Sequence, residues 1–471
     1  MNSAAPRNWQ VRNWQARNWQ ARNWQDGPPG RLENAFIFVS LLLVTQALTP
    51  LLLIGVSSDD TLGDSHPGTL LSALLVYAVA LFLVARRPGA MLRTILDDWL
   101  LLAVFALPLL SVIWSVDHAT SARRVVALLM TGLYCVYIAR RLSPDEFLRH
   151  LLLALFAGGV ASLAYTWLDP RQAIEQSAIN TGSWKGVYGH KAILGRIAAI
   201  AVTVSVYVKP RLTYEHVLRW ATIAIFLFLA VQSQSRASWL MMLGGFAFMF
   251  LMAVLRNQRF SSGIKLAVAL CMGVAVLAAT AVMFESVLAA FGRDDTFSGR
   301  TSLWHGAVAV ANANHPVLGA GYRAFWTNTG AAEVRDYIQG WARLPGHGHN
   351  GYLDVWLELG WAGVALFALF LLVMIVRLAR RVLRAPEERA WAAFSIFFFV
   401  FILNNFSVTV AFKHTDIAWV AAILACLYTH GCVTAGQPVM PRAARRSWRG
   451  LALPRPAPAF APRPGLSGAR S

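Results

Sequence analysis

The sequence predicts an all-α integral membrane protein with about twelve transmembrane helices. Of its 471 residues, 57% are hydrophobic and only 14% are charged, which is too apolar a balance for a soluble protein of this length. Apolar runs of roughly 17 to 25 residues, long enough to cross a bilayer as a helix, recur along most of the chain. The expected spans are 34–56, 69–85, 97–115, 124–139, 147–168, 188–208, 217–231, 237–255, 264–284, 353–376, 391–410 and 417–431.

Basic residues gather in alternate connections between these spans. About two thirds of the 42 Lys and Arg lie in segments that would share one side of the membrane with the N-terminus. Since cytoplasmic connections keep Lys and Arg, we expect both termini to be cytoplasmic. Arginines beside anionic lipid heads then explain the net charge of +19, and no nucleic-acid partner is expected. The expected cytoplasmic segments are 1–33, 86–93, 140–141, 209–219, 256–265, 377–389 and the tail from 433.

The composition divides the chain into five parts. Residues 1–33 repeat Arg-Asn-Trp-Gln four times and are expected to form a disordered cytoplasmic tail. The first nine spans occupy 34–284, and the last three occupy 352–432. Between them, 285–351 form the longest connection, a large loop on the outer face of the membrane between the ninth and tenth helices. Residues 433–471 are rich in Pro and Arg and are expected to be a disordered basic tail.

The long outer connection is expected to be an ordered cap domain. Residues 302–312 have helical apolar spacing, and His315 followed by Pro316 marks the end of that helix. Aromatic content of this kind argues against a disordered loop. The aromatic residues are Trp304, Tyr322, Phe325, Trp326, Tyr337 and Trp341.

His349 and Asn350 stand at the start of the tenth expected span. A titratable imidazole at a membrane surface normally has a function. Its ordinary pKa of about 6.5 suits a general base that accepts the proton of a hydroxyl. The alternative is a loop histidine that caps the following helix. His347 lies two residues earlier, but no third ligand completes a metal site, and the four cysteines lack metal-binding spacing.

Two acidic residues and two glycines follow inside the same span. Asp354 and Glu358 lie four residues apart on one helical face, a costly placement unless they face a polar cavity. For Asp354, the positive start of the helix is an alternative explanation. Gly360 and Gly363 lie about one helical turn apart, so we expect another helix to approach closely behind the site.

Basic residues on the outer face form a second group of candidates. Arg236 opens the eighth expected span, and Arg300 lies near the start of the cap domain. Guanidinium groups match phosphate oxygens bidentately, so they can neutralise a diphosphate without a metal. The alternative is that these arginines only reflect the usual distribution of charge beside membrane helices, or that they pair with a nearby Asp. The pairing explanation suits Arg293 better than Arg300. In the sixth span, Lys191 and Arg196 either face an anionic ligand or snorkel from a helix end.

His349 and Asn350 are followed after nine residues by Gly360 and after two more residues by Gly363. This spacing resembles the signature of the O-antigen ligase and polysaccharide polymerase superfamily. The stretches around Arg236 and Arg300 resemble the arginine-bearing segments of that family, and the stretch from His190 is similar to a third segment. Ala192 departs from the pattern, because members often carry Asn there, so an amide contact from this position is absent. The resemblance covers roughly 114–363.

This resemblance implies a glycosyltransferase in a bacterial inner membrane that needs neither a metal nor another cofactor. An acceptor hydroxyl would attack, with inversion, the sugar carbon that bears the diphosphate of an undecaprenyl-diphosphate-linked glycan. Other expected partners are a glycan or lipid A core acceptor, membrane lipids and further polysaccharide-export machinery. The resemblance implies catalytic roles for His349, Arg300 and Arg236 and substrate binding by Asn350, Lys191, Arg196, Asp354 and His190.

Members of this superfamily differ in their acceptor. A polymerase joins lipid-linked repeat units, whereas a ligase moves a finished chain onto lipid A core. Residues 298–304 and 114–117 most resemble succinoglycan-type exopolysaccharide polymerases, so polymerisation is the leading prediction. A transporter is an alternative of another class, but it commonly has two six-helix halves joined by a long inner connection, whereas the longest connection here is outside. A non-catalytic membrane scaffold is the remaining alternative.

Overall fold

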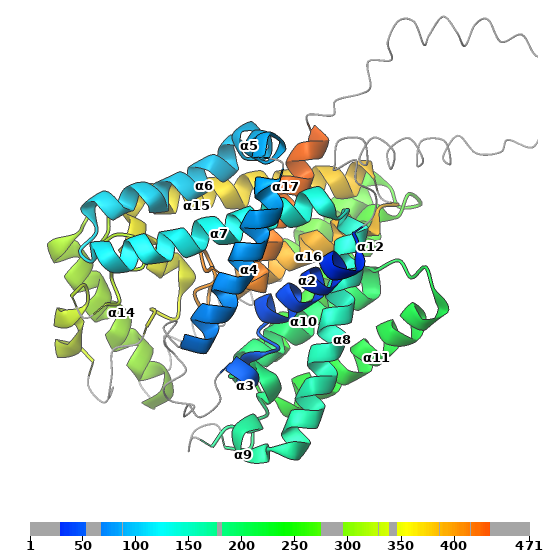
Figure 1. The fold of residues 1–471 in the computed structure, drawn as a ribbon, viewed down its shortest axis with the longest axis horizontal. Helices are drawn as coiled ribbons and strands as arrows, with labels where there is room; N and C mark the ends of the chain where they lie inside the picture. Colours follow the sequence, from blue (N-terminus) through cyan, green and yellow to red (C-terminus); the bar gives the residue numbers. More distant parts are fainter. Residues whose placement is uncertain are drawn as a thin grey trace, which may run out of the picture. The chain divides into compact units, whose positions relative to one another are not determined.

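The computed structural model describes residues 29–52, 67–86, 88–176, 181–274, 295–327, 329–338, 346–385, 387–414 and 416–433. The chain divides into two units, Met1–His430 and Gly431–Ser471. The first unit contains the helices described below, and only the last turn of α17 (Ile417–Val433) extends beyond it (Figure 1). The Arg-Asn-Trp-Gln repeats and the basic C-terminal tail lie outside the described residues.

The helices follow the expected apolar runs, and the protein is a multi-pass membrane protein. In the part of the chain that the structure describes, four helices are long and apolar enough to cross a membrane by length and composition: α7 (His118–Arg141), α8 (Pro144–Leu168), α11 (Thr213–Gln232) and α15 (Gly351–Arg384). Shorter apolar helices accompany them, and a total of about twelve spans stays a prediction. The other helices are α2 (Arg31–Val44), α3 (Thr49–Leu52), α4 (Pro67–Ala85), α5 (Pro88–Asp97), α6 (Trp99–Ser111), α9 (Pro170–Ala173), α10 (Lys191–Tyr207), α12 (Arg236–Arg256), α14 (Asp295–Asn314) and α16 (Arg389–Asn404). The 3-10 turns are η2 (Val112–Trp114), η3 (Gly186–Tyr188) and η5 (Ala332–Asp336).

Polar side chains fix where the long helices begin. The Ser143 hydroxyl accepts a hydrogen bond from the N–H of Glu146, and the Glu146 carboxylate accepts one from the N–H of Ser143, so α8 begins with a reciprocal capping box. The Asp117 carboxylate accepts a hydrogen bond from the N–H of Thr120 at the start of α7. The first N–H groups of a helix have no partner within the helix, and these caps supply one. They therefore fix the start of each helix in the turn between two apolar runs.

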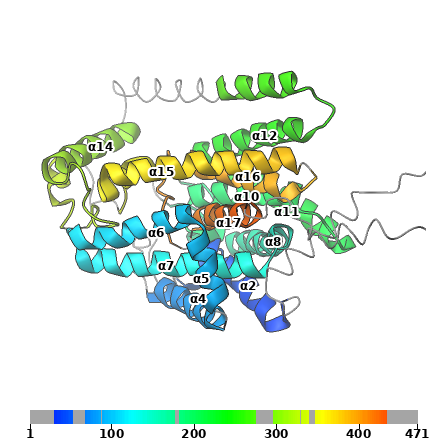
Figure 2. The ribbon, with the colours of Figure 1, turned by 90° about the horizontal axis from the view of Figure 1, so that it is seen from above.

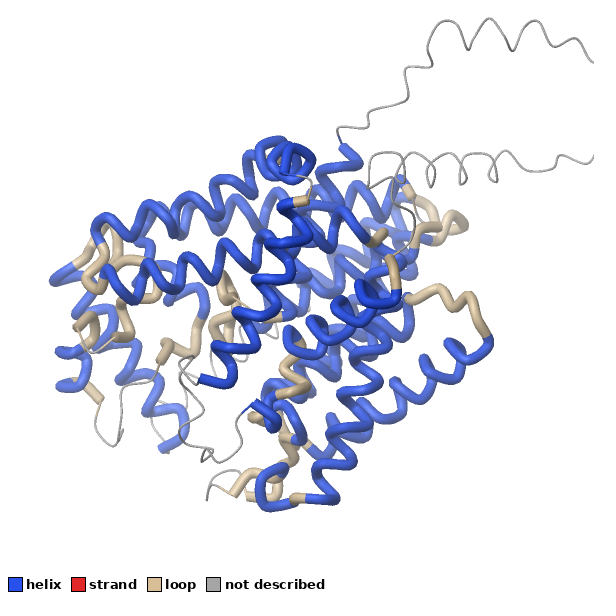
Figure 3. Tube along the Cα trace, in the orientation of Figure 1, coloured by secondary structure: helices blue, strands red, loops and turns tan. Residues whose placement is uncertain are grey.

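Helix α15 packs on the bundle along one face and exposes Leu372 and Ile375 on another. It packs against α6, α12 and α16, and Figure 2 shows it beside α16 and α17. Aromatic rings fill the space between these helices: Phe370 of α15 lies 5.8 Å from Trp419 of α17 between ring centroids, and Phe367 lies 6.2 Å from Phe401 of α16. In the described residues every regular element is helical, and the one β contact is an isolated bridge between residues 174 and 184 (Figure 3).

The cap domain packs on the start of α15, and the prediction of a helix there is confirmed. Helix α14 ends at Asn314, directly before His315, and lies beside the start of α15 (Figure 2). Its apolar face joins η5 and α15 in one hydrophobic cluster. The fully buried members of this cluster are Leu303, Ala307, Ala320, Phe325, Ala331, Val334 and Leu357.

The first expected span is interrupted. Helix α2 ends at Val44, whereas the sequence predicted one helix over 34–56. The next residues turn: the Thr45 hydroxyl donates to the carbonyl of Leu41 at 2.8 Å, and Gln46 has a left-handed φ of 64°. Left-handed backbone cannot continue an α-helix, so a separate short helix, α3, follows. Residues 53–56 lie outside the described residues.

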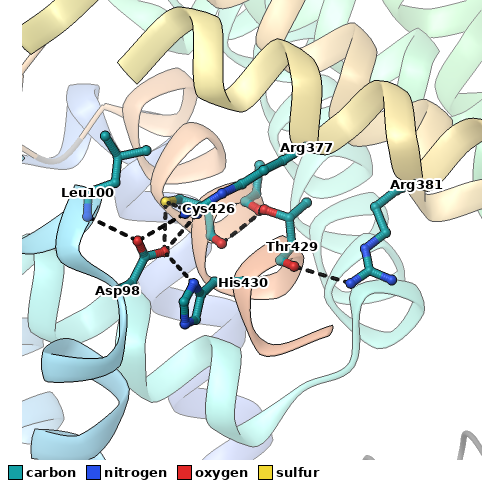
Figure 4. Close-up of polar contacts among 8 residues, drawn as sticks. Asp98, Leu100, Arg377, Arg381, Cys426, Thr429 and His430 are labelled. Carbon is teal, nitrogen blue, oxygen red and sulfur yellow. Dashed lines mark hydrogen bonds and ion pairs between the residues drawn. The ribbon is translucent and has the colours of Figure 1, made fainter. Parts of the chain in front are cut away.

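At the end of α15 away from the cap domain, buried polar side chains gather around one carboxylate (Figure 4). Asp98 accepts hydrogen bonds from Arg377 Nη1 at 2.9 Å and from Cys426 Sγ at 3.2 Å, and the ring of His430 lies 3.7 Å from it. The sequence predicted that the span ends at 376 because arginines follow. Helix α15 itself continues to Arg384, beyond the expected end of the span, and Asp98 compensates the charge of Arg377.

Candidate functional site

The candidate site lies where the cap domain meets the start of α15. Residues 346–350 lead into this helix, and the Asn350 side chain accepts hydrogen bonds from the N–H groups of Tyr352 at 3.1 Å and Leu353 at 3.2 Å. Asn is favoured at this position because its carboxamide oxygen satisfies N–H groups that lack a partner in the helix. Asn350 therefore fixes the point at which the loop becomes helical, and its binding of substrate stays a prediction.

His349 has an unusual backbone conformation. Its φ is 51°, in the left-handed region that residues other than glycine rarely adopt. The His349 N–H donates to Nδ1 of His347 at 3.0 Å, and the centroids of the two rings lie 4.2 Å apart. Strained backbone of this kind costs about 1–3 kcal/mol and persists only where surrounding contacts enforce it. The partly exposed imidazole is thus held on a constrained loop beside the membrane helix.

Asp354 ties this loop to two other segments. Its carboxylate accepts hydrogen bonds from the indole N–H of Trp326 at 2.7 Å, from the N–H of Gly348 at 2.9 Å and from the hydroxyl of Thr409. The residue is only 1% exposed, so a carboxylate without such donors would be costly here. The expected polar surroundings of Asp354 are therefore supplied by the protein itself, directly beside His349.

The loop after α16 also contacts the start of α15. The Asn405 side-chain oxygen accepts hydrogen bonds from the N–H groups of Val410 at 3.2 Å and Ala411 at 2.9 Å, which shapes this loop. The Asn405 carbonyl accepts the N–H of Gly351 at 2.7 Å. Its side chain lies so close to Gly351 that a Cβ on that glycine would collide with it. Segments about 50 residues apart in sequence therefore meet at the start of α15.

A loop, and not the second helix that the sequence predicted, approaches Gly360. Gly360 has φ 62° and ψ −160°, so α15 is kinked there. The Val317 carbonyl accepts the N–H of Trp361 at 3.0 Å, and the N–H of Ala320 donates to the carbonyl of Leu357 at 2.9 Å. A Cβ at Gly360 would collide with the Val317 carbonyl. The kink thus frees backbone groups of α15, and the loop satisfies them.

Arg323 and Arg124, which the sequence did not suggest as candidates, lie near the second buried carboxylate, that of Glu358. Glu358 is 5% exposed; its carboxylate accepts a backbone hydrogen bond from Arg323, and the charges of Arg323 and of Arg124 in α7 stabilise it. Arg323 has a left-handed φ of 58°. The signal that could have found it is the pair Gly319 and Gly321 just before it, because both have positive φ and form the tight loop at the kink.

Tyr322 anchors this loop to the rest of the protein. Its hydroxyl donates to the carbonyl of Phe412 at 2.6 Å, and its N–H donates to the Ser111 hydroxyl at 3.0 Å. The Ser121 hydroxyl donates to the Tyr322 carbonyl at 2.7 Å. Burial raises the pKa of Tyr322 to about 12, so the hydroxyl keeps its proton and remains a donor at neutral pH. These bonds connect α6, α7 and the loop after α16 to the backbone that carries Arg323.

His190 and Lys191 lie at the start of α10. The Nδ1 atom of His190 accepts the N–H of Ala192 at 3.2 Å, so the exposed imidazole caps this helix. Desolvation by the surrounding protein lowers the pKa of His190; Lys191 and Lys185 lower it further, while Glu175 opposes them. The sequence placed these basic groups beside an anionic ligand, and that role stays a prediction.

Arg196 is buried in α10 and paired. Its Nη2 atom lies 3.0 Å from Oδ2 of Asp416, and the two side chains are 4% and 0% exposed. The Asp416 carboxylate also accepts the N–H of Ala418 at 2.9 Å, at the start of α17. The structure thus shows the Arg196 guanidinium bound to α17, and its predicted contact with substrate is not tested.

The side chains of Arg236 and Arg300 lie outside the described part of the chain. The backbone places Arg236 at the first position of α12 and Arg300 in α14. Their binding of a diphosphate stays a prediction. Within the ranges that the structure describes, no three His, Cys, Asp or Glu side chains gather where they could hold a metal ion.

Comparisons with known proteins connect this site to a family. Residues 220–368 match the family model of O-Antigen ligase. The chain is also similar to the exopolysaccharide production protein ExoQ of Rhizobium meliloti (strain 1021), with 30% identity over 108 residues. Over these matched residues the chain is similar to the O-antigen ligase and polysaccharide polymerase superfamily. The resemblance predicted from the sequence is thereby confirmed.

The matched region contains the central part of the site described above, while Thr409 and Asn405 lie outside it. It begins within α11 and includes α12, the cap domain, the His349 loop and the kink at Gly360. The likeness to ExoQ covers 22% of this chain and 25% of ExoQ, so this protein spans about a quarter of that relative in the match. The superfamily region is therefore the part of the chain on which a functional proposal rests most directly.

Proposed function

We propose that this protein is a membrane glycosyltransferase that polymerises undecaprenyl-diphosphate-linked repeat units of an exopolysaccharide or O-antigen at the periplasmic face of the bacterial inner membrane. The observation that carries the proposal is the His349 loop, which contacts from three segments hold at the start of α15 inside the O-Antigen ligase region. A catalytic base needs this kind of fixed placement. A histidine that merely caps a helix does not.

The reaction forms a glycosidic bond. An acceptor hydroxyl oxygen attacks the anomeric carbon of the donor, the bond from that carbon to the diphosphate oxygen breaks, and undecaprenyl diphosphate leaves with the bonding electrons. His349 accepts the hydroxyl proton, and attack opposite the leaving group inverts the configuration. Arg300 and Arg236 bind the diphosphate oxygens and stabilise the negative charge that grows on them, so this step requires no metal.

Other predicted substrate-binding residues fit this scheme through their positions. His190 and Lys191 lie at the N-terminal end of α10, where the helix dipole favours anions such as the donor phosphates. Arg196 is paired with Asp416, so its effect on the substrate would pass through the placement of α10. The Asn350 side-chain oxygen caps α15, and its amide nitrogen can donate to a sugar hydroxyl.

The acceptor distinguishes the polymerase from its alternative. The description O-Antigen ligase favours attachment of a finished chain to lipid A core, whereas the likeness to an exopolysaccharide production protein favours polymerisation. Glycan analysis of a deletion strain separates the two. Single lipid-linked repeat units accumulate if the protein is a polymerase, and full-length lipid-linked chains accumulate if it is a ligase.

A purified system tests the chemistry directly. The protein in lipid nanodiscs would receive an undecaprenyl-diphosphate-linked repeat unit, and product length would be followed on gels. We expect a ladder of polymers from the wild type and a loss of about 100-fold or more in rate for His349→Ala and Arg300→Ala. His216→Ala, in an exposed position of α11, serves as the matched control and retains the rate. A His349→Ala variant that polymerises at the normal rate would refute the assignment.

The proposed orientation places both termini in the cytoplasm and the cap domain in the periplasm. It rests on the excess of Lys and Arg in alternate connections, because such connections remain cytoplasmic. Alkaline phosphatase inserted after Glu333 of the cap domain should be active, since the enzyme needs the periplasm to fold. The same reporter at the C-terminus should be inactive; activity there would reverse the orientation.

A further inference from the structure

We infer that Asp354 is a positioning residue, which fixes the His349 loop in the conformation that glycosyl transfer needs without itself touching the substrate. This inference rests on the proposed function, because it gives Asp354 a part in proton transfer to His349. The sequence suggested a direct contact between Asp354 and substrate. The surroundings of the carboxylate support a different use.

The carboxylate of Asp354 is fully engaged by the protein. Oδ1 accepts the Trp326 indole N–H at 2.7 Å and the Gly348 N–H at 2.9 Å, while Oδ2 accepts the Thr409 hydroxyl and lies 3.1 Å from the same Gly348 nitrogen. With the residue 1% exposed, a sugar hydroxyl could reach these oxygens only by displacing an existing donor. Direct binding of substrate would therefore break the structure that the carboxylate maintains.

The hydrogen bonds fix the backbone just before His349. The N–H of Gly348 donates to Asp354, and the carbonyl of Gly348 accepts the indole N–H of Trp304 at 2.7 Å. Both peptide groups that flank Gly348 are thus oriented by side chains from rigid helices, α15 and α14. The next residue, His349, adopts its left-handed φ of 51° against this fixed frame. Strain of this kind persists where neighbouring contacts enforce it.

Glycine at 348 allows the close approach of the carboxylate. A Cβ there would lie 2.7 Å from Asp354 Oδ1 and 3.1 Å from the Trp326 ring. Gly348→Ala would therefore separate the loop from the carboxylate while the carboxylate itself remains. This substitution gives a second way to disturb the same contact, independent of any loss of charge at Asp354.

The variants are compared in the nanodisc polymerisation assay. Asp354→Ala and Gly348→Ala should each lower kcat by about 100-fold, because displacement of a reacting group by about 1 Å has an effect of this size. The KM for the lipid-linked donor should change by less than about twofold, since no substrate contact is removed. Thr409→Val, which removes one of three donors, should have an intermediate effect.

Asp354→Asn provides the conservative test. Its oxygen can keep the bonds from Trp326 and Gly348, and its amide nitrogen can donate to the Thr409 hydroxyl, which is able to accept. We expect this variant to retain at least about half of the wild-type kcat, because geometry and not charge carries the role. Loss of activity in Asp354→Asn equal to that in Asp354→Ala would overturn the inference, and so would a rise in KM with kcat unchanged.

A readout without catalysis separates this inference from the proposed function. In hydrogen exchange, amides of residues 346–353 should exchange at least about tenfold faster in Asp354→Ala than in the wild type or in Asp354→Asn. Thr222→Val, which removes a buried hydroxyl bonded within α11, is the control and should leave this segment unchanged. An inactive wild type would contradict the proposed function alone. Unchanged exchange in Asp354→Ala would contradict the positioning role whether or not the enzyme is active.

Discussion

Arg377 of α15 and Asp98, which precedes α6, form a bidentate ion pair inside the bundle, with Nη1 2.9 Å from Oδ2 and Nη2 3.3 Å from Oδ1. The Asp98 side chain is fully buried and that of Arg377 is 12% exposed. Arg377 also lies 23 residues after Asp354, about 35 Å along the helix, so this pair is remote from the candidate site. Its role is therefore expected to be structural.

Removing one member of this pair should destabilise the protein more than removing both. Arg377→Met or Asp98→Leu alone leaves a buried charge uncompensated, which costs about 3–5 kcal/mol. The double variant replaces the pair with apolar side chains and should lose less than either single variant. Unfolding free energies in one detergent, combined in a double-mutant cycle, measure this coupling. Additive losses would show that the two charges do not stabilise one another.

Gly360→Ala should remove the kink at the site. Alanine at φ 62° is strained, and its Cβ would meet the Val317 carbonyl, so we expect a loss of about 1–3 kcal/mol in stability together with a large fall in polymerisation. Gly245→Ala in α12 is the matched control, because no atom lies within 4 Å of a Cβ there and alanine favours the helix. Equal stability of the two variants would contradict the role given to the kink.

The sequence could locate the helices because each apolar run has to be buried or face lipid, and polar caps separate the runs. Helices α7 and α8 begin at His118 and Pro144, a few residues before the expected spans at 124 and 147. The length of α15 could not be predicted in this way. Arg377 lies inside this helix and pairs with Asp98, which is 279 residues away in sequence, so no local pattern indicates the pairing.

The roles of the candidate site residues stay predictions, but the sequence did indicate where several of them lie. His349, Asp354 and Glu358 were proposed because their spacing relates them to the start of one helix, and the structure places them there. Arg323 was missed because contacts from three distant segments, and not its neighbours, bring it to Glu358. Gly363 was expected to admit another helix, but a Cβ there would meet side chains of its own helix, so spacing alone did not identify the neighbour.

The helix cap at His190 should make stability depend on pH. Desolvation by the surrounding protein, together with Lys191 and Lys185, lowers the pKa of His190 below its ordinary value of about 6.5, so the unfolded chain binds this proton more readily than the folded protein. Stability should therefore fall as the pH drops below about 6.5 and level off below the folded-state pKa. Melting temperatures from pH 7.5 to about 5 measure the slope.

His190→Asn supplies the comparison for that slope, because Asn can cap α10 without titrating. We expect a flatter dependence of melting temperature on pH in this variant, with the difference confined to the acidic side. His216→Asn, at an exposed position in α11, is the matched histidine control and should keep the wild-type slope. If His190→Asn and the wild type lose stability in parallel, another group is responsible.

Arg323 and Glu358 should also be energetically coupled. Arg323→Ala removes the guanidinium whose charge stabilises the buried Glu358 carboxylate, so it should lower stability by about 1–3 kcal/mol. Arg323→Gly should lose about 1 kcal/mol less than Arg323→Ala, because glycine adopts a φ of 58° without strain. Adding Glu358→Gln to Arg323→Ala should restore part of the loss, since a neutral amide needs no cation.

Unfolding midpoints of these variants in one lipid composition measure the coupling, with Arg335→Ala, an exposed arginine of η5, as the matched control. The control should change stability by less than about 0.5 kcal/mol, because surface substitutions seldom have larger effects. A double variant that loses the sum of the two single losses would mean that Arg323 and Glu358 act independently. Partial recovery would instead show that the left-handed loop after Gly321 exists to bring a positive charge to a carboxylate inside α15.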